Sequence, residues 1–160
     1  MVTKMKAAVF SDTHSNTALM VEAVRRTRPD MIIHLGDHER DTDILRREFP
    51  DIPVYSVCGN CDFAPTSPLT DIVPMGPVKA LICHGHSYGV EYNNVDRLVY
   101  AAQEQNCSLA MFGHTHSAYN GEAGGVKVIN PGTAGKGRHL TYAFIEVFDN
   151  GGIASEIREL

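Results

Sequence analysis

The sequence has no run of apolar residues that approaches the roughly 20 needed to cross a membrane, and its first residues lack the long apolar segment of a signal peptide. We therefore expect a cytoplasmic protein with no membrane partner. A surplus of positive charge is also missing, because the formal net charge is −5 with histidine neutral. This balance argues against a broad binding surface for extended nucleic acid.

The sequence has only four cysteines, and their placement argues against two further classes of protein. Cys83 and Cys107 lie in or beside apolar runs, so we expect buried thiols rather than the disulfide framework of a secreted domain. Cys58 and Cys61 fit the C-x-x-C spacing of a thiol–disulfide enzyme, but that motif should open a helix, and the DFAP segment 62–65 is a poor helix start. A structural zinc site would need a second closely spaced pair.

The length of 160 residues is enough for one domain with a proper core, and we expect a single domain over residues 1–160. In the first third, apolar periodicity predicts strands over 5–10, 30–35 and 52–57. It also predicts one helix that Ser15 or Asn16 caps and Pro29 ends, and another over 42–49. Strands and helices that alternate in this way favour parallel βαβ units with right-handed crossovers.

The second half of the chain has a different pattern. One helix is expected from about residue 94, and strands are expected over 71–73, 78–83, 109–112, 125–129, 142–148 and 153–158. The last two strands are joined at Asn150-Gly151, which is a hairpin turn signal. We therefore predict an α/β fold in which two mixed β-sheets pack face to face as a sandwich with helices outside.

Side chains that can bind metal follow the ends of the expected strands. The clearest case is the segment 112–116, where a glycine turns the chain after a buried strand and two histidines follow one residue apart. Because ligands collect outside the carboxyl ends of strands in α/β folds, we expect these loops to converge. Their mixture of carboxylate, imidazole and amide groups suits borderline divalent ions. The strand ends carry Asp12-x-His14, Gly36-Asp37, Gly59-Asn60, His84-Gly85-His86, Gly113-His114-x-His116 and Asn130-Pro131-Gly132.

In this order the motifs resemble those of the calcineurin-like metallophosphoesterases, which carry D-x-H, G-D, G-N-[H/C]-D, H-G-x and G-H-x-H. The resemblance runs from about residue 5 to residue 133, and the overall size and the GNCD segment 59–62 resemble the small stand-alone bacterial and archaeal phosphodiesterase branch. It implies a four-layer αββα fold. It also implies metal-dependent hydrolysis of a small phosphoester, with a phosphodiester favoured.

The resemblance also implies a role for each motif residue. Two divalent ions are expected, Mn²⁺ first and Ni²⁺, Co²⁺, Fe²⁺ or Zn²⁺ as alternatives. They bring a charge of about +4, Asp12 and Asp37 contribute about −2, and a bridging hydroxide leaves a net charge of about +1, which still attracts a phosphate. The hydroxide is expected to attack phosphorus in line. The expected catalytic residues are Asp37, Asn60 and His86, the last as a substrate contact. The expected ligands are Asp12, His14, Asp37 and His116 for the first ion and Asp37, Asn60, His84 and His114 for the second.

Other residues near the motifs are expected to support the site or to lie outside it. His34 and Asp62 should orient the ligands, and the segment 130–133 should form a structural turn. His38, Asp41 and His139 belong to no motif and are expected at the surface.

Two positions depart from the family pattern. Cys61 stands where many members have a histidine, often assigned to leaving-group protonation or phosphate contact. Cys58 stands where an arginine or lysine is common in the related small phosphodiesterases.

An alternative is a catalytically weak scaffold or binding protein of the same fold, because a retromer subunit resembles these enzymes and has lost much of its metal motifs. This sequence keeps all the expected ligand types, which favours the enzyme. A homo-oligomer is compatible with the sequence.

Overall fold

Two five-stranded sheets face each other in the computed structural model, which describes residues 2–160. The first sheet has the strand order β10-β9-β1-β2-β3. Strands β1, β2 and β3 run parallel to one another, whereas β9 and β10 are antiparallel to their neighbours. The strands are β1 (Thr3–Phe10), β2 (Met31–His34), β3 (Val54–Ser56), β9 (Thr141–Phe148) and β10 (Ile153–Glu159).

The second sheet has the order β4-β5-β6-β8-β7 and is also mixed. Strands β5, β6 and β8 run parallel, and the edge strands β4 and β7 are antiparallel to their neighbours. The strands are β4 (Thr70–Met75), β5 (Val78–Cys83), β6 (Leu109–Met111), β7 (Tyr119–Ala123) and β8 (Val126–Asn130).

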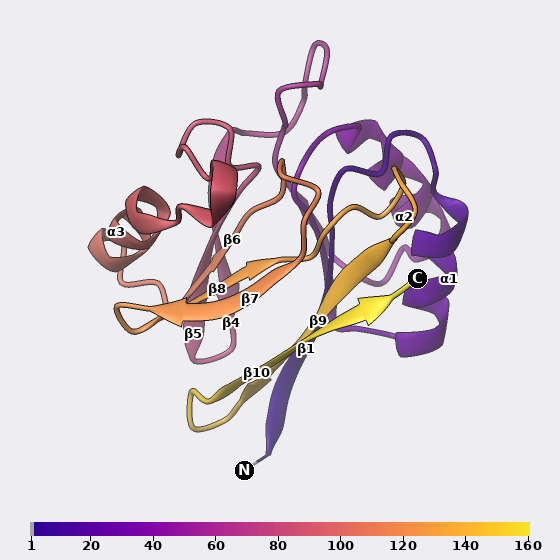
Figure 1. Ribbon diagram of the computed structural model, residues 1–160. Helices are drawn as coiled ribbons and strands as arrows, with labels where there is room; N and C mark the ends of the chain where they lie inside the picture. Colours follow the sequence, from indigo (N-terminus) through magenta and orange to yellow (C-terminus); the bar gives the residue numbers. More distant parts are fainter. Residues whose placement is uncertain (1) are drawn as a thin grey trace.

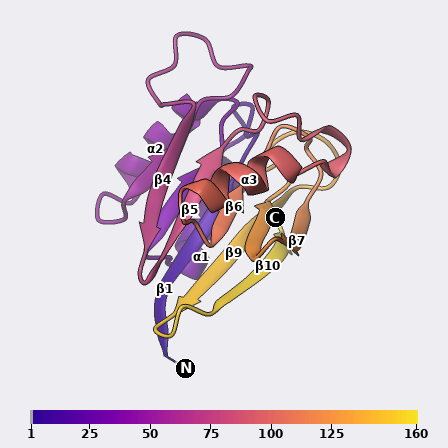
Figure 2. The ribbon, with the colours of Figure 1, turned by 90° about the vertical axis from the view of Figure 1, so that its left-hand side faces the viewer.

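Helices cover the outer faces of the sandwich. Figure 1 shows α1 (Ala18–Thr27) and α2 (Thr42–Glu48) beside the first sheet, and α3 (Asp96–Glu104) beside the second. Figure 2 shows α3 in front of the second sheet when that side faces the viewer. The layers therefore follow the predicted order of helix, sheet, sheet and helix. Among the described residues, no helix combines the length and the apolar character that crossing a bilayer requires.

Alternating side chains along β1 explain how the first sheet packs against both the second sheet and the helices. Ala7 and Val9 belong to the core between the sheets, whereas Ala8 and Phe10 belong to the core beneath α1 and α2. Successive side chains of a strand point to opposite faces, so one strand serves both cores. Phe10 is fully buried and stacks on the ring of Tyr142 at a centroid distance of 5.3 Å. Full burial of such a side chain stabilises the fold by ~1.5–3 kcal/mol.

Two local expectations were wrong. No strand was expected over 119–123, yet β7 forms there because it pairs with the whole of β8. Helix α1 begins at Ala18 after Thr17, without a side-chain cap hydrogen bond. Ser15 does not cap this helix; instead its hydroxyl lies 2.9 Å from His38 Nδ1.

Parallel strands of both sheets end on the same edge of the sandwich. The loops that follow β1, β2, β5 and β6 meet there. Asp37 from the loop after β2, His84 from the loop after β5 and His114 from the loop after β6 all approach Asp12, which lies in the loop after β1. In Figure 1 the long loop between β3 and β4 and the segment between β5 and α3 also rise from this edge.

Candidate metal centre

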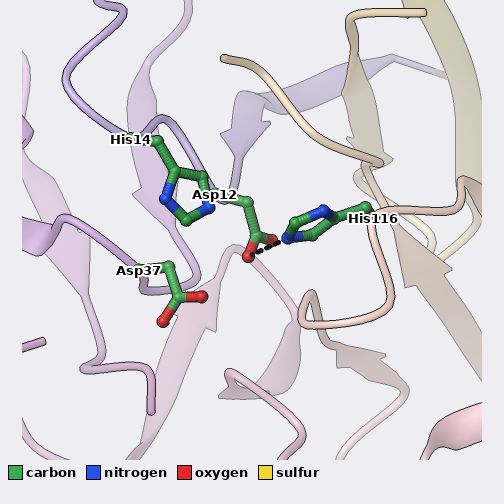
Figure 3. Close-up of side chains that lie close together, drawn as sticks. All are labelled: Asp12, His14, Asp37 and His116. Carbon is green, nitrogen blue, oxygen red and sulfur yellow. Dashed lines mark ion pairs between the residues drawn. The ribbon is translucent and has the colours of Figure 1, made fainter. Parts of the chain in front are cut away.

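The most compact group of candidate ligands comprises Asp12, His14, Asp37 and His116, whose ligand atoms all lie within 4.8 Å of one another. Figure 3 shows the four side chains converging, with His116 Nε2 3.2 Å from Asp12 Oδ1. The two carboxylates are buried, at 0% exposure for Asp12 and 3% for Asp37. Buried carboxylates this close need either a proton or a nearby positive charge.

Asp12 keeps one carboxylate oxygen available for such a charge. Its Oδ2 accepts hydrogen bonds from Ser11 Oγ at 2.5 Å and from the His114 amide at 3.3 Å. Its Oδ1 is buried and has no hydrogen-bond partner among residues 2–160. Burial raises the pKa of the Asp12 carboxyl. A metal ion at Oδ1 would stabilise the charged form that burial disfavours.

The two carboxylate oxygens of Asp37 also differ in their contacts. Its Oδ1 accepts a hydrogen bond from the Cys61 amide at 2.8 Å, and its Oδ2 lies 3.4 Å from His84 Nε2. Burial acts to raise the pKa of this carboxyl, but the contacts with His84 and Cys61 outweigh burial and hold the pKa below its usual range. Asp37 is therefore negatively charged at neutral pH.

The tautomer of His84 gives the clearest test of whether a metal fits. Its Nδ1 lies 2.7 Å from the carbonyl oxygen of Leu35, which can only accept, so Nδ1 carries the proton. In the neutral ring, Nε2 then presents a lone pair to Asp37 Oδ2 at 3.4 Å and Asp12 Oδ1 at 3.9 Å. His84 Nε2, Asp37 Oδ2 and Asp12 Oδ1 are then three acceptors that face one another, and only a proton or a metal ion between them can satisfy them. Burial lowers the pKa of His84, but the contacts with Asp37 and Asp12 outweigh burial and raise the pKa above its usual value.

A second group of candidate ligands lies on the side of His84. His114 Nε2 is 3.2 Å from Glu91 Oε1, and His114 Nδ1 is 3.1 Å from Asn60 Oδ1. When Glu91 accepts the single N–H of a neutral ring at Nε2, the Nδ1 lone pair faces the amide oxygen of Asn60. Two such electron-pair donors can share a divalent cation. The rings of His84 and His114 have centroids 5.1 Å apart, so this pair lies next to His84.

His86 lies beside the second group, with its ring centroid 5.6 Å from that of His84 and 6.3 Å from that of His114. Its Nδ1 is buried and has no hydrogen-bond partner in the described part of the chain. Burial lowers the pKa of His86, and the neighbouring rings of His84 and His114 lower it further. A neutral ring with an unused nitrogen can donate or accept one hydrogen bond.

The backbone at the site is strained. A left-handed conformation, with φ between 46° and 69°, occurs at five of the candidate ligands, Asp12, His14, Asp37, His114 and His116. Such conformations cost ~1–3 kcal/mol each and collect at functional sites. Glycines make room for the loops: a Cβ at Gly59 would collide with Asp37 Oδ1, and one at Gly113 with Ser11 Oγ.

His34 and Asp62 hold the loops, as the sequence suggested. His34 is fully buried; its Nδ1 accepts the Gly36 N–H at 3.2 Å, so Nε2 donates to Thr13 Oγ1 at 3.0 Å. Burial lowers the pKa of His34 to about 4. The Asp62 carboxylate accepts the backbone N–H groups of Asp37 at 3.0 Å, Gly59 at 2.7 Å and Glu39 at 2.9 Å.

The segment 130–133 is a structural turn that joins two of the ligand loops. Asn130 Nδ2 donates to the Gly113 carbonyl at 3.1 Å, and Asn130 Oδ1 accepts the Gly132 N–H at 2.9 Å. Thr133 Oγ1 donates to the Asp12 carbonyl at 3.1 Å. The turn thus fixes the backbone on either side of the carboxylate.

Of the three residues expected at the surface, His139 is exposed, whereas His38 and Asp41 are half-buried. His38 is half-buried with its ring centroid 5.0 Å from that of His14, and Asp41 accepts the Ser15 N–H at 2.8 Å. Sequence reasoning also missed three polar side chains that shape the site, and no motif would have found them. They are Ser11, Glu39, whose buried carboxylate accepts the Thr66 and Ser67 N–H groups, and Glu91.

The surroundings of Cys58 and Cys61 differ from those of a thiol–disulfide motif. Cys83 and Cys107 are buried thiols, as predicted. No helix follows Cys61 before β4 begins at Thr70, so the arrangement lacks the helix start that a thiol–disulfide motif needs.

Comparisons with known proteins agree with this geometry. Residues 5–150 match the calcineurin-like phosphoesterase superfamily domain. The chain is 30% identical over 142 residues to the probable metallophosphoesterase MG207 of Mycoplasma genitalium, covering 86% of this chain and 82% of that protein.

Solved structures show the same fold. A novel archaeal phosphodiesterase superposes with a TM-score of 0.73 at 21% identity, covering 96% of this chain and 100% of that one. The zinc complex of Vps29 from Entamoeba histolytica superposes with a TM-score of 0.76 at 20% identity, covering 97% and 99%. The sheet order and layers described above are therefore those of a known phosphoesterase fold.

Proposed function

Since the chain belongs to the calcineurin-like phosphoesterase superfamily, we propose that it is a phosphodiesterase that acts on a small phosphoester. The enzyme would use two divalent transition-metal ions, of which Mn²⁺ is the first choice. Membership of the family supports a phosphoester hydrolase. The observation that carries the dinuclear site is the geometry of His84, whose Nε2 lone pair faces both Asp12 and Asp37. The phosphodiesterase named among the structural relatives supports the choice of a diester.

The first ion would be bound by Asp12, His14, Asp37 and His116, and the second by Asp37, Asn60, His84 and His114. When bound, the ions would lower the pKa of a water molecule and neutralise charge that develops on the phosphoryl oxygens. Asp37 would serve both positions, because its Oδ1 is held by the Cys61 amide and its Oδ2 faces His84.

The chain's own residues would then orient the substrate. Asn60 is exposed, so its amide is accessible from solvent as well as from the second position. The half-buried ring of His86 lies next to His84 and His114 and would donate a hydrogen bond to a phosphoryl oxygen. Such a bond matters most if it strengthens as charge builds on that oxygen in the transition state.

Purified protein that has been stripped of metal and reloaded with Mn²⁺ tests the proposal. We expect two equivalents of bound metal by elemental analysis, and hydrolysis of bis(4-nitrophenyl) phosphate with higher kcat/KM than 4-nitrophenyl phosphate. A single bound equivalent would contradict the dinuclear site, and a preference for the monoester would contradict the diesterase. Two bound equivalents with no turnover of any phosphoester would favour a scaffold of the same fold.

A further inference from the structure

Two cavities open beside the candidate metal centre, one on each side. The first has a volume of about 280 Å³, and Cys61, whose amide is bonded to Asp37, forms part of its wall. Its other lining residues include Ser15, His38, Arg40, Asp41 and Phe63. It therefore adjoins the group that contains His14 and Asp37.

The second cavity has a volume of about 410 Å³ and adjoins the opposite group of ligands. It is lined by Glu91, Tyr92, His114, Thr115 and Ser117. Because His114 faces Asn60 and His84, this cavity begins where the second group ends. A phosphate at the metal centre would thus have open space on both sides.

Each cavity carries an aromatic ring that is almost wholly exposed. Phe63 is 91% exposed and Tyr92 is 102% exposed. The backbone of Tyr92 is left-handed, at φ 60° and ψ 28°, which is a strained conformation for a bulky residue. The other exposed tyrosine among the large apolar side chains, Tyr100, lies on α3 and lines neither cavity.

An exposed ring beside a phosphate site is suited to stacking on a flat ligand. Stacking of a nucleobase on an aromatic side chain contributes ~1–3 kcal/mol. In the first cavity, Arg40 forms no ion pair with any of residues 2–160, so its N–H groups are available to the carbonyl oxygens of a base. The net charge of −5 argues against a long nucleic acid, so the ligand must be short.

We infer that the substrate is a dinucleoside monophosphate, with the base on one side of the phosphate stacked on Phe63 and the base on the other side stacked on Tyr92. This inference rests on the proposed phosphodiesterase function. In the reaction, the oxygen of a water molecule bonds to phosphorus, and the bond from phosphorus to one nucleoside oxygen breaks. That oxygen takes up a proton from the water, so the products are one nucleoside and one nucleoside monophosphate. A monoester would fill only one cavity, and a dialkyl diester would leave both rings unused.

Kinetics with a dinucleoside monophosphate test the two rings in the manganese-loaded enzyme. Phe63→Ala and Tyr92→Ala should each raise KM by ~5-fold to 100-fold, the range that a lost stacking contact predicts. The ring-retaining variants Phe63→Tyr and Tyr92→Phe should restore the KM of the unsubstituted protein. Tyr100→Ala, which removes an exposed ring elsewhere, is the matched control and should not change KM. A KM within twofold of the unsubstituted value in either alanine variant would overturn the inference.

Binding to the metal-free protein separates this inference from the proposed function. The probe is a dinucleoside methylphosphonate, which is uncharged and so is not repelled by Asp12 and Asp37. Its titration should shift the ring proton resonances of both Phe63 and Tyr92 by NMR, and each alanine variant should weaken its affinity. Shifts in neither ring or in one ring only would overturn the inference, even if bis(4-nitrophenyl) phosphate is hydrolysed. Failure of the loaded enzyme to hydrolyse any phosphoester would instead overturn the proposed function.

Discussion

The first group of candidate ligands, Asp12, His14, Asp37 and His116, is more closed than the second. Its carboxylates are buried and its ligand atoms lie within 4.8 Å of one another. In the second group Asn60 is exposed, and both nitrogens of His114 face other side chains. The fold therefore brings the ligand atoms of the first position together around two buried carboxylates, whereas the second position includes an exposed ligand, Asn60. We expect the two positions to differ in affinity in that order.

Removal of metal should have the largest effect. A chelator followed by dialysis should reduce phosphodiester hydrolysis to background, because the ions supply both the activated water and the positive charge. Titration of Mn²⁺ back into the protein, followed by calorimetry, should give one tight and one weaker binding step, with activity returning in the second. Equal affinities would contradict the difference between the positions, and undiminished activity in excess chelator would contradict metal dependence.

Asp37→Ala should remove the residue that both positions share. We expect kcat to fall by ~10³-fold and both binding steps to weaken, whereas His116→Ala should weaken only the tight step. Elemental analysis and calorimetry report the two steps separately. Cys107→Ala, a buried change just before the start of β6 and so at the opposite end of that strand from His114, should keep activity close to that of the unsubstituted protein. An Asp37→Ala protein that retains both metals and a tenth of kcat would show that Asp37 does not bridge.

The complete burial of His34 should also make the metal-free fold sensitive to acid. Its pKa is about 4 in the folded protein and ~6.5 in an unfolded chain. Between these values the unfolded chain binds more protons, so the free energy of unfolding should fall by up to ~3 kcal/mol as pH drops from ~6.5 towards 4. Urea unfolding across this range measures the fall. His34→Gln should show a smaller slope, and an identical slope would exclude His34 as its source.

Glu91→Ala should give the smallest effect and act only on the second position. Glu91 accepts the N–H of His114, so its removal leaves that ring free to rotate. Loss of such an orienting partner typically lowers metal affinity by ~10-fold or more. The weaker calorimetric step should shift while the tight step stays unchanged. Glu104→Ala, an exposed change on α3, should move neither; a shift of the tight step in Glu91→Ala would contradict the separation of the two positions.

The sequence predicted the layers and the meeting of the ligand loops because both depend on local patterns. Asp12, Asp37 and His114 each follow the buried end of a strand, and parallel strands end on one edge. Strand β7 was not predictable in this way, because it alternates between half-buried and exposed residues and depends on its pairing with β8. The contact of Glu91 with His114 joins residues 23 positions apart and belongs to no motif. Such partners are set by how loops cross, which spacing along the chain does not encode.

Gly113 limits how this chain can evolve. A Cβ there would collide with Ser11 Oγ and lie 2.9 Å from Asp12 Oδ2, and both obstacles are side chains rather than backbone. As long as Ser11 and Asp12 are present, selection must keep a glycine at 113. A descendant that first lost these two side chains could accept a larger residue at 113, and that residue would then occupy the space the carboxylate needs. From that point restoring aspartate at position 12 alone would not restore the site, so no one substitution by itself would bring the metal chemistry back.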